Sequence, residues 1–256
     1  MSQILFADPA GNLTAIIRGA EPEKRLPIAK AILDAGKAEQ VGFEVPPMYG
    51  GCGRLEMMGG EFCGNAARAF AFQKAAEQWP DGEHELCVEI SGVEKPVPVR
   101  VDLDNGTAFA QMPLPLELAC CEVDGTAYPV VVMEGIWHLI AEDREPSEEF
   151  VKHAIQAVEQ FQPEAFGILF LQQERLTPAV WVRATQSLVW ESSCGSGSLA
   201  CGWYLSKRET KRTDGEARYT FSQRGGVIET VFCRENDRIV SCSMGGSVLL
   251  SGWEPV

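Results

Sequence analysis

Two short stretches with the same pattern, residues 61–71 (EFCGNAARAFA) and 192–202 (SSCGSGSLACG), organise the whole chain. Each holds a Cys-Gly-polar triplet, beginning at Cys63 or at Cys194, and a run of small and apolar residues follows. A helix that is apolar on every side is buried on every side. Both stretches therefore predict a central helix that is enclosed by strands and carries the Cys-Gly pair at its N-terminus.

Further landmarks of the two halves recur in the same order along the chain. Gly11 and Gly135 each precede an apolar, strand-like run, and Gly92 and Gly226 each turn into alternating, β-prone residues. Landmarks that repeat in order at similar spacing indicate an internal repeat. We therefore expect an α+β fold of two similar halves, each strand-rich with one short outer helix and one central helix.

The two outer helices have their own start and stop signals. Residues 26–36 (LPIAKAILDAG) have Pro27 near the expected start and Gly36 as the stop signal. Residues 147–161 have Ser147 as the expected N-cap and acidic residues in the first turn. The apolar stripe of this second helix consists of Phe150, Ala154 and Val158. The proline-rich step at 112–118 (MPLPLEL) predicts the domain boundary, with an N-terminal domain 1–115 and a second domain from residue 116.

Composition narrows the classes of function. The 256 residues carry a formal net charge of −14, which disfavours nucleic acid as a partner because phosphate binding needs basic surface. The first residues do not resemble a signal peptide, and no apolar segment has the length of a membrane span. We expect a cytoplasmic protein that has no membrane partner.

Nine cysteines and three histidines are present, without a C-x-x-C pair. Disulfides are rare in the cytosol, so free thiols are expected, and the spacing does not support a metal site. Seven of the nine are expected to be small buried apolar residues. These seven are Cys52, Cys87, Cys120, Cys121, Cys201, Cys233 and Cys242.

The placement of Cys63 and Cys194 predicts acid–base chemistry. A helix N-terminus presents unpaired N–H groups and about half a positive charge, which favours a thiolate and is expected to lower the cysteine pKa. The same N–H groups can hold a carboxylate. If the halves face each other, one thiolate can remove an α-proton while the opposite thiol protonates the other face of the carbon. This predicts stereoinversion next to a carboxylate without a cofactor.

At these residues the chain resembles the diaminopimelate epimerase superfamily of pyridoxal-phosphate-independent racemases. Residues 61–71 match that family's first cysteine motif, including Glu61 and Arg68, and residues 192–202 match its second. The resemblance implies two pseudo-symmetric domains, each a β-barrel-like sheet around a central helix. The closing residues 243–255 look like the family's final strand, which returns to the first domain. The expected division is thus 1–115 with 246–256, and 116–245.

The resemblance also implies the site and the assembly. It makes Cys63 and Cys194 the acid–base pair and implies a homodimer. Other residues are expected to bind the amino-acid substrate, through the backbone next to each cysteine or through side chains. These residues are Asn12, Gly64, Asn65, Gly195, Ser196, His138 and Glu191.

Departures from the epimerase pattern bear on the substrate. The family has Gly-Asn-Pro-His in the second half, where this chain has Gly-Ile-Trp-His at 135–138, and the family's Glu-Arg-Gly segment before Cys194 is absent. A site without these groups is expected to bind diaminopimelate poorly, because a buried unpaired charge is costly. The sequence ESSCGSGS at 191–198 is most similar to the corresponding segment of amino-acid racemases that act on histidine.

Alternatives remain open at this stage. Diaminopimelate epimerase is the main rival, and a non-catalytic small-molecule binding protein on the same fold is the second. His138 is either a site residue or a half-buried histidine satisfied within a strand. Glu191 either holds the substrate ammonium, orients a thiol, or is a residue stabilised by the helix end. A serine hydrolase is disfavoured, because Cys194 breaks the Gly-x-Ser-x-Gly elbow.

Overall fold

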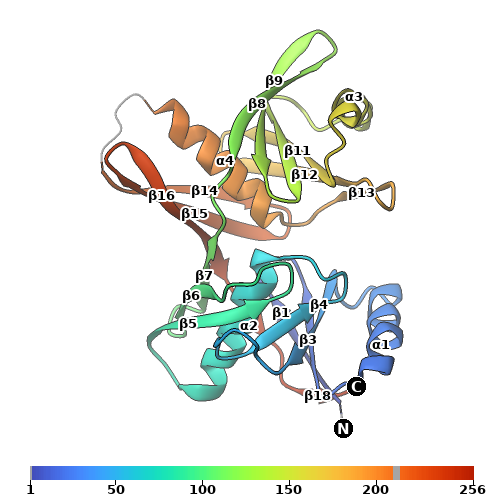
Figure 1. The fold of residues 1–256 in the computed structure, drawn as a ribbon, viewed down its shortest axis with the longest axis vertical. Coiled ribbons are helices and arrows are strands. Elements are labelled where there is room, and N and C mark those ends of the chain that lie inside the picture. The colour runs from blue at the N-terminus through green and yellow to red at the C-terminus, as the bar shows by residue number, and fades with distance from the viewer. Residues whose placement is uncertain (1, 210–213) are drawn as a thin grey trace. The chain divides into compact units, whose positions relative to one another are not determined.

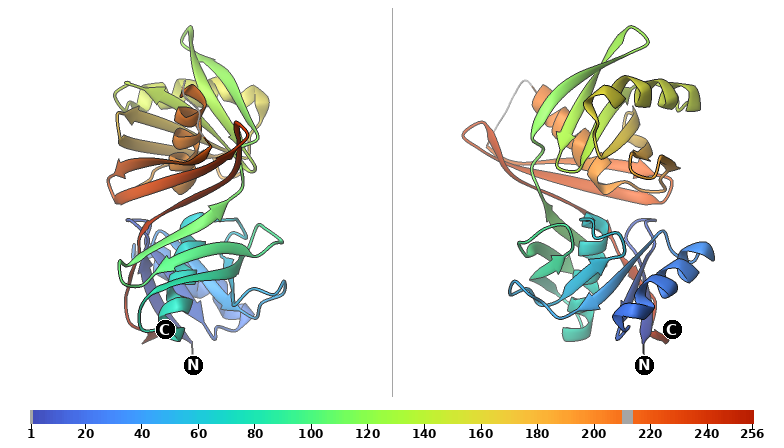
Figure 2. Two further views of the ribbon diagram at one scale, coloured as in Figure 1. Left: turned by 90° about the vertical axis from the view of Figure 1, so that its left-hand side faces the viewer. Right: turned by 45° about the vertical axis from the view of Figure 1, so that its right-hand side comes forward.

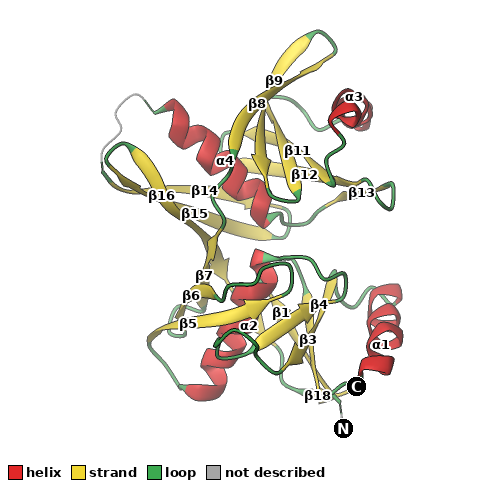
Figure 3. Cartoon of the chain, in the orientation of Figure 1, coloured by secondary structure: helices red, strands yellow, loops and turns green. Residues whose placement is uncertain are grey.

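The structure is a computed structural model that describes residues 2–209 and 214–256, and the chain divides into two compact units (Figure 1). Unit 1 comprises Met1–Met112 and Met244–Val256, and unit 2 comprises Pro113–Ser243. The fold is mixed α+β and dominated by sheets, with few helices (Figure 3). In the described part of the chain, no helix combines the length and apolarity that a membrane span requires.

Unit 1 contains a long series of paired strands and two helices. Its elements are β1 (Gln3–Asp8), β2 (Thr14–Arg18), α1 (Pro22–Asp34), β3 (Gln40–Val45), β4 (Arg54–Met57), α2 (Gly64–Gln78), β5 (Glu83–Ile90), β6 (Val97–Asp102), β7 (Thr107–Met112), β17 (Leu249–Leu250) and β18 (Glu254–Pro255), with the end of β16 (Arg238–Ser247). β1 pairs antiparallel with β2, β2 parallel with β3, β3 antiparallel with β4, and β4 parallel with β5. β5, β6 and β7 then form an antiparallel series, and β7 pairs with β16.

The helix α2 lies in the middle of unit 1, packed against β5, β6 and β7 and also against β1 and β2. Every residue from Gly64 to Gln73 is buried, so the expectation of a helix buried on all sides is confirmed. Three of these residues, Asn65, Arg68 and Gln73, are polar, and the Arg68 side chain has hydrogen-bond partners within unit 1.

The outer helix α1 begins earlier than the sequence predicts. It starts at Pro22, so Pro27 lies inside the helix rather than near its start. Proline is well suited to the first helical position, because its φ is already helical and its missing N–H has no acceptor there in any case. The helix ends before Gly36, which has φ +63°, as the stop signal predicted. Its apolar face, with Ala29 and Ile32, packs in a small cluster with β3 residues.

Unit 2 repeats this succession of elements. Its elements are β8 (Glu117–Val123), β9 (Thr126–Met133), β10 (Ile136–Glu142), α3 (Glu148–Val158), η1 (Glu159–Phe161), β11 (Ala165–Gln172), β12 (Arg175–Val182), β13 (Ser187–Trp190), α4 (Gly195–Arg208), β14 (Gly215–Gln223), β15 (Gly226–Glu235) and most of β16. β9 pairs antiparallel with β10, β10 parallel with β11 across α3, and β11 antiparallel with β12. β12 is parallel to β14, which pairs antiparallel with β15. The order of parallel and antiparallel pairs from β1 to β6 recurs here.

The helices of unit 2 have distinct environments. Ser147 caps α3 by accepting a hydrogen bond from the Phe150 N–H at 3.3 Å, and Phe150, Ala154 and Val158 are buried, as predicted. Figure 2 shows α3 on the outside of the unit 2 sheet. The helix α4 instead packs against β10, β11, β14 and β15, and most of its N-terminal half is buried.

Candidate active site

The first candidate residue, Cys63, is the N-cap of α2. Its backbone is extended, and its sulfur accepts a hydrogen bond from the N–H of Ala66 at 3.4 Å. A Cβ at the next residue, Gly64, would lie 2.6 Å from the Met112 sulfur, so a larger residue there would require the Met112 side chain to move. Since the first N–H groups of a helix have no acceptor in that helix, this end of α2 can bind an anion next to the thiol.

Polar side chains of unit 1 form a network beside Cys63. The Asn65 amide donates to Asn12 Oδ1 at 3.2 Å, and Gln40 Nε2 donates to the same oxygen at 2.9 Å. Asn65 Oδ1 accepts from Arg68 Nε at 3.1 Å, and Arg68 also donates to the carbonyls of Gly246 and Ser247. The structure thus brings the predicted residues Asn12 and Asn65 together at the first cysteine motif. Burial lowers the pKa of the Arg68 guanidinium to about 10, so it is charged at neutral pH.

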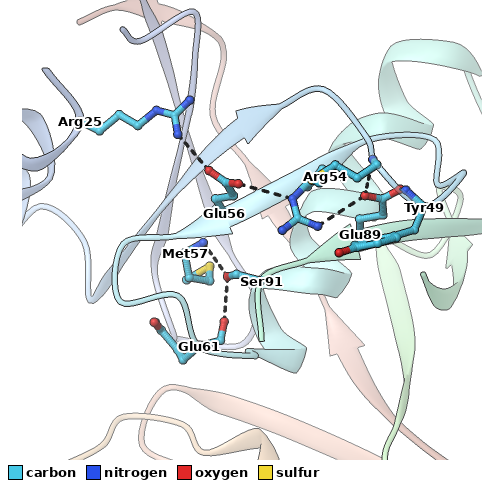
Figure 4. Close-up of polar contacts among 9 residues, drawn as sticks. Arg25, Tyr49, Arg54, Glu56, Met57, Glu61, Glu89 and Ser91 are labelled. Atoms are coloured by element: carbon cyan, nitrogen blue, oxygen red, sulfur yellow. Dashed lines mark hydrogen bonds and ion pairs between the residues drawn. The ribbon is translucent and has the colours of Figure 1, made fainter. Parts of the chain in front are cut away.

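The segment that precedes Cys63 is held by the end of β5 (Figure 4). The Ser91 hydroxyl donates to the Glu61 carbonyl at 2.9 Å and accepts from the Met57 N–H at 2.9 Å. The following residue, Gly92, has φ +81°, and a Cβ there would lie 2.3 Å from the Phe62 nitrogen. These contacts set the path of the chain into the N-terminus of α2.

A second anchor on β5 holds the neighbouring loop (Figure 4). The buried Glu89 carboxylate accepts from the N–H groups of Met48, Tyr49 and Gly51 at 2.7, 2.6 and 3.0 Å, and Arg54 lies 3.5 Å away. The Glu89 carboxylate therefore holds this loop against β5.

The second candidate, Cys194, is the N-cap of α4 with the same geometry. Its sulfur accepts from the N–H of Gly197 at 3.3 Å, and its own N–H donates to Gln223 Oε1 at 2.8 Å. A Cβ at Gly197 would lie 2.8 Å from Leu169 Cδ2 and 3.1 Å from the Cys194 sulfur, so a larger residue there would require these side chains to shift. Gln223 Nε2 in turn donates to Ser198, whose hydroxyl donates to the Cys194 carbonyl.

His138 lies next to this second cysteine motif. Its Nε2 is 3.0 Å from the Ser196 hydroxyl, which is 3.6 Å from the Cys194 sulfur. The ring is fully buried rather than half-buried, and burial lowers its pKa to about 3, so the imidazole is neutral. It fits because Gly167 is its partner on β11, where a Cβ would lie 2.2 Å from His138 Nδ1.

The pKa values of the Cys63 and Cys194 thiols are raised, whereas lowered values were expected. Burial raises the pKa of Cys63, and the N–H of Ala66 and the Gln40 side chain offset this only in part. Burial also raises the pKa of Cys194 well above its ordinary value, and Glu191 adds to this through its charge and a hydrogen bond. The sequence predicted lowered values from the helix N-termini. Desolvation of a buried thiolate outweighs that contribution.

Other cysteines also differ from expectation. Cys121, Cys201 and Cys242 are buried, as predicted, and Cys233 is half-buried. Three others, Cys52, Cys87 and Cys120, are exposed, because they occupy outward positions next to or within strands whose alternate residues face the core. All nine are free thiols. Among the described residues, no group of three or more His, Cys, Asp and Glu is arranged to hold a metal ion.

Several residues of these two environments were not found from the sequence. Strand pairing and helix packing bring these residues to the cysteine motifs. They are Gln40, Ser91, Gly92 (through its contact with Phe62), Gly167 and Gln223. Their positions in the chain carry no local signal, apart from the predicted turn at Gly92.

Two solved structures with a similar fold are a PhzF-family protein and a hydroxyproline epimerase. A PhzF-family phenazine biosynthesis protein from Bacillus anthracis matches with a TM-score of 0.72 and 12% identity, over 100% of this chain and 99% of that one. A hydroxyproline epimerase from Agrobacterium vitis, with bound trans-4-hydroxy-L-proline, matches with a TM-score of 0.70 and 10% identity, over 100% and 90%. These likenesses establish the fold, which is similar to that of the PhzF and proline racemase proteins.

Sequence comparison is more specific. Residues 4–252 match the family described as the histidine racemase CntK N-terminal domain. The histidine racemase of Fusobacterium nucleatum is 34% identical over 247 residues, which are 91% of this chain and 88% of the relative. The chain therefore belongs to the histidine racemase family. It is an isomerase, an amino-acid racemase.

Proposed function

We propose that this protein racemises histidine, using Cys63 and Cys194 as a pair of acid and base and no cofactor. The observation that carries the proposal is the equivalence of the two cysteines. Each caps a buried helix, with its sulfur 3.4 or 3.3 Å from the N–H of the third helical residue. Relatives named histidine racemase, at 34% and 25% identity, support the choice of substrate.

In the proposed reaction, the two sulfurs act on opposite faces of one α-carbon. A thiolate on one side takes the α-proton, and the electron pair of the C–H bond remains on the substrate as a carbanion conjugated with its carboxylate. The thiol on the other side then donates its proton to the opposite face. The enzyme ends with the proton on the first sulfur and the thiolate on the second, ready for the reverse reaction.

The developing negative charge needs stabilisation, and we assign this to the two helix N-termini. The backbone N–H groups of Gly64 and Asn65 in α2, and of Gly195 and Ser196 in α4, are the donors proposed for the α-carboxylate. Helix ends carry a positive partial charge that needs no reorganisation during the reaction. The glycines support this role, because they let a ligand approach the backbone closely.

The remaining predicted residues have proposed roles around the substrate. Asn12 belongs to the network at Cys63, and Glu191 acts on the Cys194 thiol. We propose that Glu191 also faces the substrate ammonium group. Diaminopimelate is a less favoured substrate, because the approach to Cys194 at 188–193 carries no arginine for a second carboxylate and the matching relatives are histidine racemases.

The first experiment follows the α-proton by NMR. The reduced protein is incubated in D2O with separate L-amino acids, including histidine and LL-diaminopimelate, and chirality is measured in parallel. The expected result is loss of the histidine α-proton signal together with formation of D-histidine. Exchange with diaminopimelate alone would reject histidine as the substrate, and no exchange with any amino acid would reject the proposed function.

Replacement of either cysteine tests the two-base mechanism. Cys63→Ala and Cys194→Ala are each expected to lower the rate of racemisation by at least about 100-fold, since each removes one proton-transfer group. Cys201→Ala is the matched control, because Cys201 is a buried thiol on α4 away from the helix end, and it is expected to retain activity. A single variant at Cys63 or Cys194 that still racemises histidine at a rate near that of the unmodified protein would contradict the mechanism.

A further inference from the structure

Two of the exposed thiols of unit 1, Cys52 and Cys87, are neighbours in the structure. β4 and β5 pair in parallel, with Arg54 opposite Glu89, and the contact between the two segments continues beyond β4 to Cys52. The Cys52 N–H donates to the Cys87 carbonyl at 2.8 Å, so the backbones of the two cysteines touch directly. They form a pair of adjacent thiols outside the residues assigned to the substrate.

Contacts with Glu89 fix the backbone on both sides of Cys52. The N–H of Gly51 donates to the Glu89 carboxylate at 3.0 Å, and the carbonyl of Gly53 accepts from the Glu89 N–H at 2.8 Å. Together with the bond from Cys52 to Cys87, three successive residues are therefore held against β5. The position of Cys52 next to Cys87 is set by the folded backbone and does not need a covalent link.

The two cysteines lie within the separation that a disulfide requires. With standard bond lengths, a hydrogen bond of 2.8 Å from the Cys52 nitrogen to the Cys87 oxygen limits the Cα–Cα separation to about 6.7 Å at most. Disulfides span Cα–Cα separations of about 4.4–6.8 Å. Both cysteines are exposed, and Cys87 alternates on β5 with the buried residues Leu86 and Val88, so its side chain points away from the core.

Neighbouring charges also act on the Cys52 thiol. Burial of part of the side chain raises the pKa of Cys52, the Lys74 ammonium lowers it, and a charge on Cys87 raises it. Like charges perturb each other in this way at short range. The thiolate is the nucleophile of disulfide exchange, so Lys74 favours the reactive form of Cys52.

We propose that Cys52 and Cys87 form a redox site, which a small-molecule disulfide converts reversibly into an intramolecular disulfide. The thiolate of one cysteine attacks a sulfur of the small disulfide, forms a mixed disulfide and releases one thiolate of the reagent. The thiolate of the other cysteine then attacks the protein sulfur of the mixed disulfide and releases the second. The two protein thiols lose two electrons in total, and the reagent is reduced to two thiols that take up the two protons.

The disulfide would act on the stability of unit 1 and leave the acid–base thiol intact. The ring that it closes, residues 52–87, contains β4, Cys63 and α2. Closing a long loop restricts the unfolded chain and thereby stabilises the folded one. Because both cysteines are exposed, thiols in solution can reach the bond and reduce it again, as is typical of transient disulfides in the cytosol.

The experiment equilibrates the native, full-length chain with mixtures of reduced and oxidised glutathione. Each sample is quenched with acid, the remaining thiols are alkylated, and the digested peptides are quantified by mass spectrometry. The expected result is a linked pair of peptides containing Cys52 and Cys87, which increases with the share of oxidised glutathione and disappears after addition of dithiothreitol. On a non-reducing gel the oxidised chain is expected to run as a monomer, and its Tm is expected to rise by about 5–10 °C.

Variants separate the pair from general oxidation of exposed thiols. In Cys52→Ser and in Cys87→Ser, the remaining cysteine is expected to carry a mixed disulfide with glutathione, and the rise in Tm on oxidation is expected to be lost. Cys120→Ser is the matched control, because Cys120 is also an exposed thiol on a strand, yet its partner in the register is Pro129. This variant is expected to form the linked peptides and to gain the same Tm as the unmodified protein.

The inference is wrong if no glutathione ratio links Cys52 to Cys87 in the native chain, if the link forms only after unfolding in urea, or if it joins two chains on the non-reducing gel. It is also wrong if Cys52→Ser retains the full rise in Tm on oxidation. These measurements need neither substrate nor turnover, so their outcome is separate from that of the histidine exchange experiment.

Discussion

At the scale of single residues, burial and helix termini act on the two cysteines in opposite directions. A helix end contributes about 0.3–1 kcal/mol to a nearby charge at an exposed site. Complete burial can shift a pKa by several units, and one unit corresponds to about 1.4 kcal/mol. Cys194 is only 4% exposed, and burial raises its pKa despite the N–H donors at its sulfur. The resting protein therefore holds both cysteines as neutral thiols at neutral pH.

This state of the thiols predicts how racemisation depends on pH. Raised pKa values at Cys63 and Cys194 mean that the thiolate needed as base is scarce at pH 7 and becomes more abundant as the pH rises. The value of kcat/KM for histidine is therefore expected to increase from pH 7 to above pH 9 and to fall once neither sulfur retains a proton. Initial rates across this range in a constant-ionic-strength buffer measure the profile. A maximum below pH 7 would contradict it.

At the scale of secondary-structure elements, the end of β5 determines where α2 begins. Ser91 binds the Glu61 carbonyl, and the Gly92 backbone passes so close to Phe62 that no side chain fits. The turn after one strand therefore positions the segment that leads to Cys63. Misplacement of a catalytic group by about 1 Å can cost roughly 100-fold in rate, so this contact bears on activity as well as on stability.

Gly92→Ala tests the role of this turn. The added Cβ would meet the Phe62 nitrogen at 2.3 Å and displace the segment before Cys63, so kcat/KM is expected to fall by at least about 10-fold. Gly36→Ala is the control, because Gly36 also has positive φ, yet nothing lies within 4 Å of its added Cβ. Both variants are expected to lose about 1–2 kcal/mol of unfolding free energy from backbone strain. Equal activity of the two variants would show that the contact at Phe62 does not position Cys63.

At the scale of the whole molecule, both ends of the chain belong to unit 1. β1 pairs antiparallel with β17 and with β18, near the C-terminus. Trp253 completes this contact, with the Arg18 guanidinium 3.8 Å from its ring centroid and its Nε1 donating to Glu77 at 3.1 Å. The last residues thus stabilise the unit that contains Cys63, although they follow the sequence of unit 2.

Trp253→Ala is expected to destabilise the protein without changing the chemistry of the cysteines. Loss of the cation–π contact and of one hydrogen bond is worth about 1–2 kcal/mol, or roughly 2–8 °C in Tm. Leu249→Ala, on β17 with 68% of its surface exposed, is the control and is expected to leave Tm nearly unchanged. Thermal unfolding followed by circular dichroism gives both values, and equal Tm values for the two variants would contradict this account.

The local pattern of the sequence was sufficient for features that depend on neighbouring residues. Helix periodicity, small residues around Cys63 and Cys194, and the cap at Ser147 each involve residues within about one helical turn, so they appear in the chain as motifs. The start of α1 was missed because two prolines, Pro22 and Pro27, both suit the first helical position, and the structure places Pro22 there and Pro27 inside the helix.

The tertiary structure alone decided the features that depend on residues far apart in the chain. Ser91 reaches Glu61, and Gly167 makes room for His138, only because strand pairing brings them together. The direction of the thiol pKa shifts belongs to the same class. A motif shows that a cysteine lies at a helix N-terminus, but desolvation depends on every element packed around the sulfur, and that packing exists only in the folded chain.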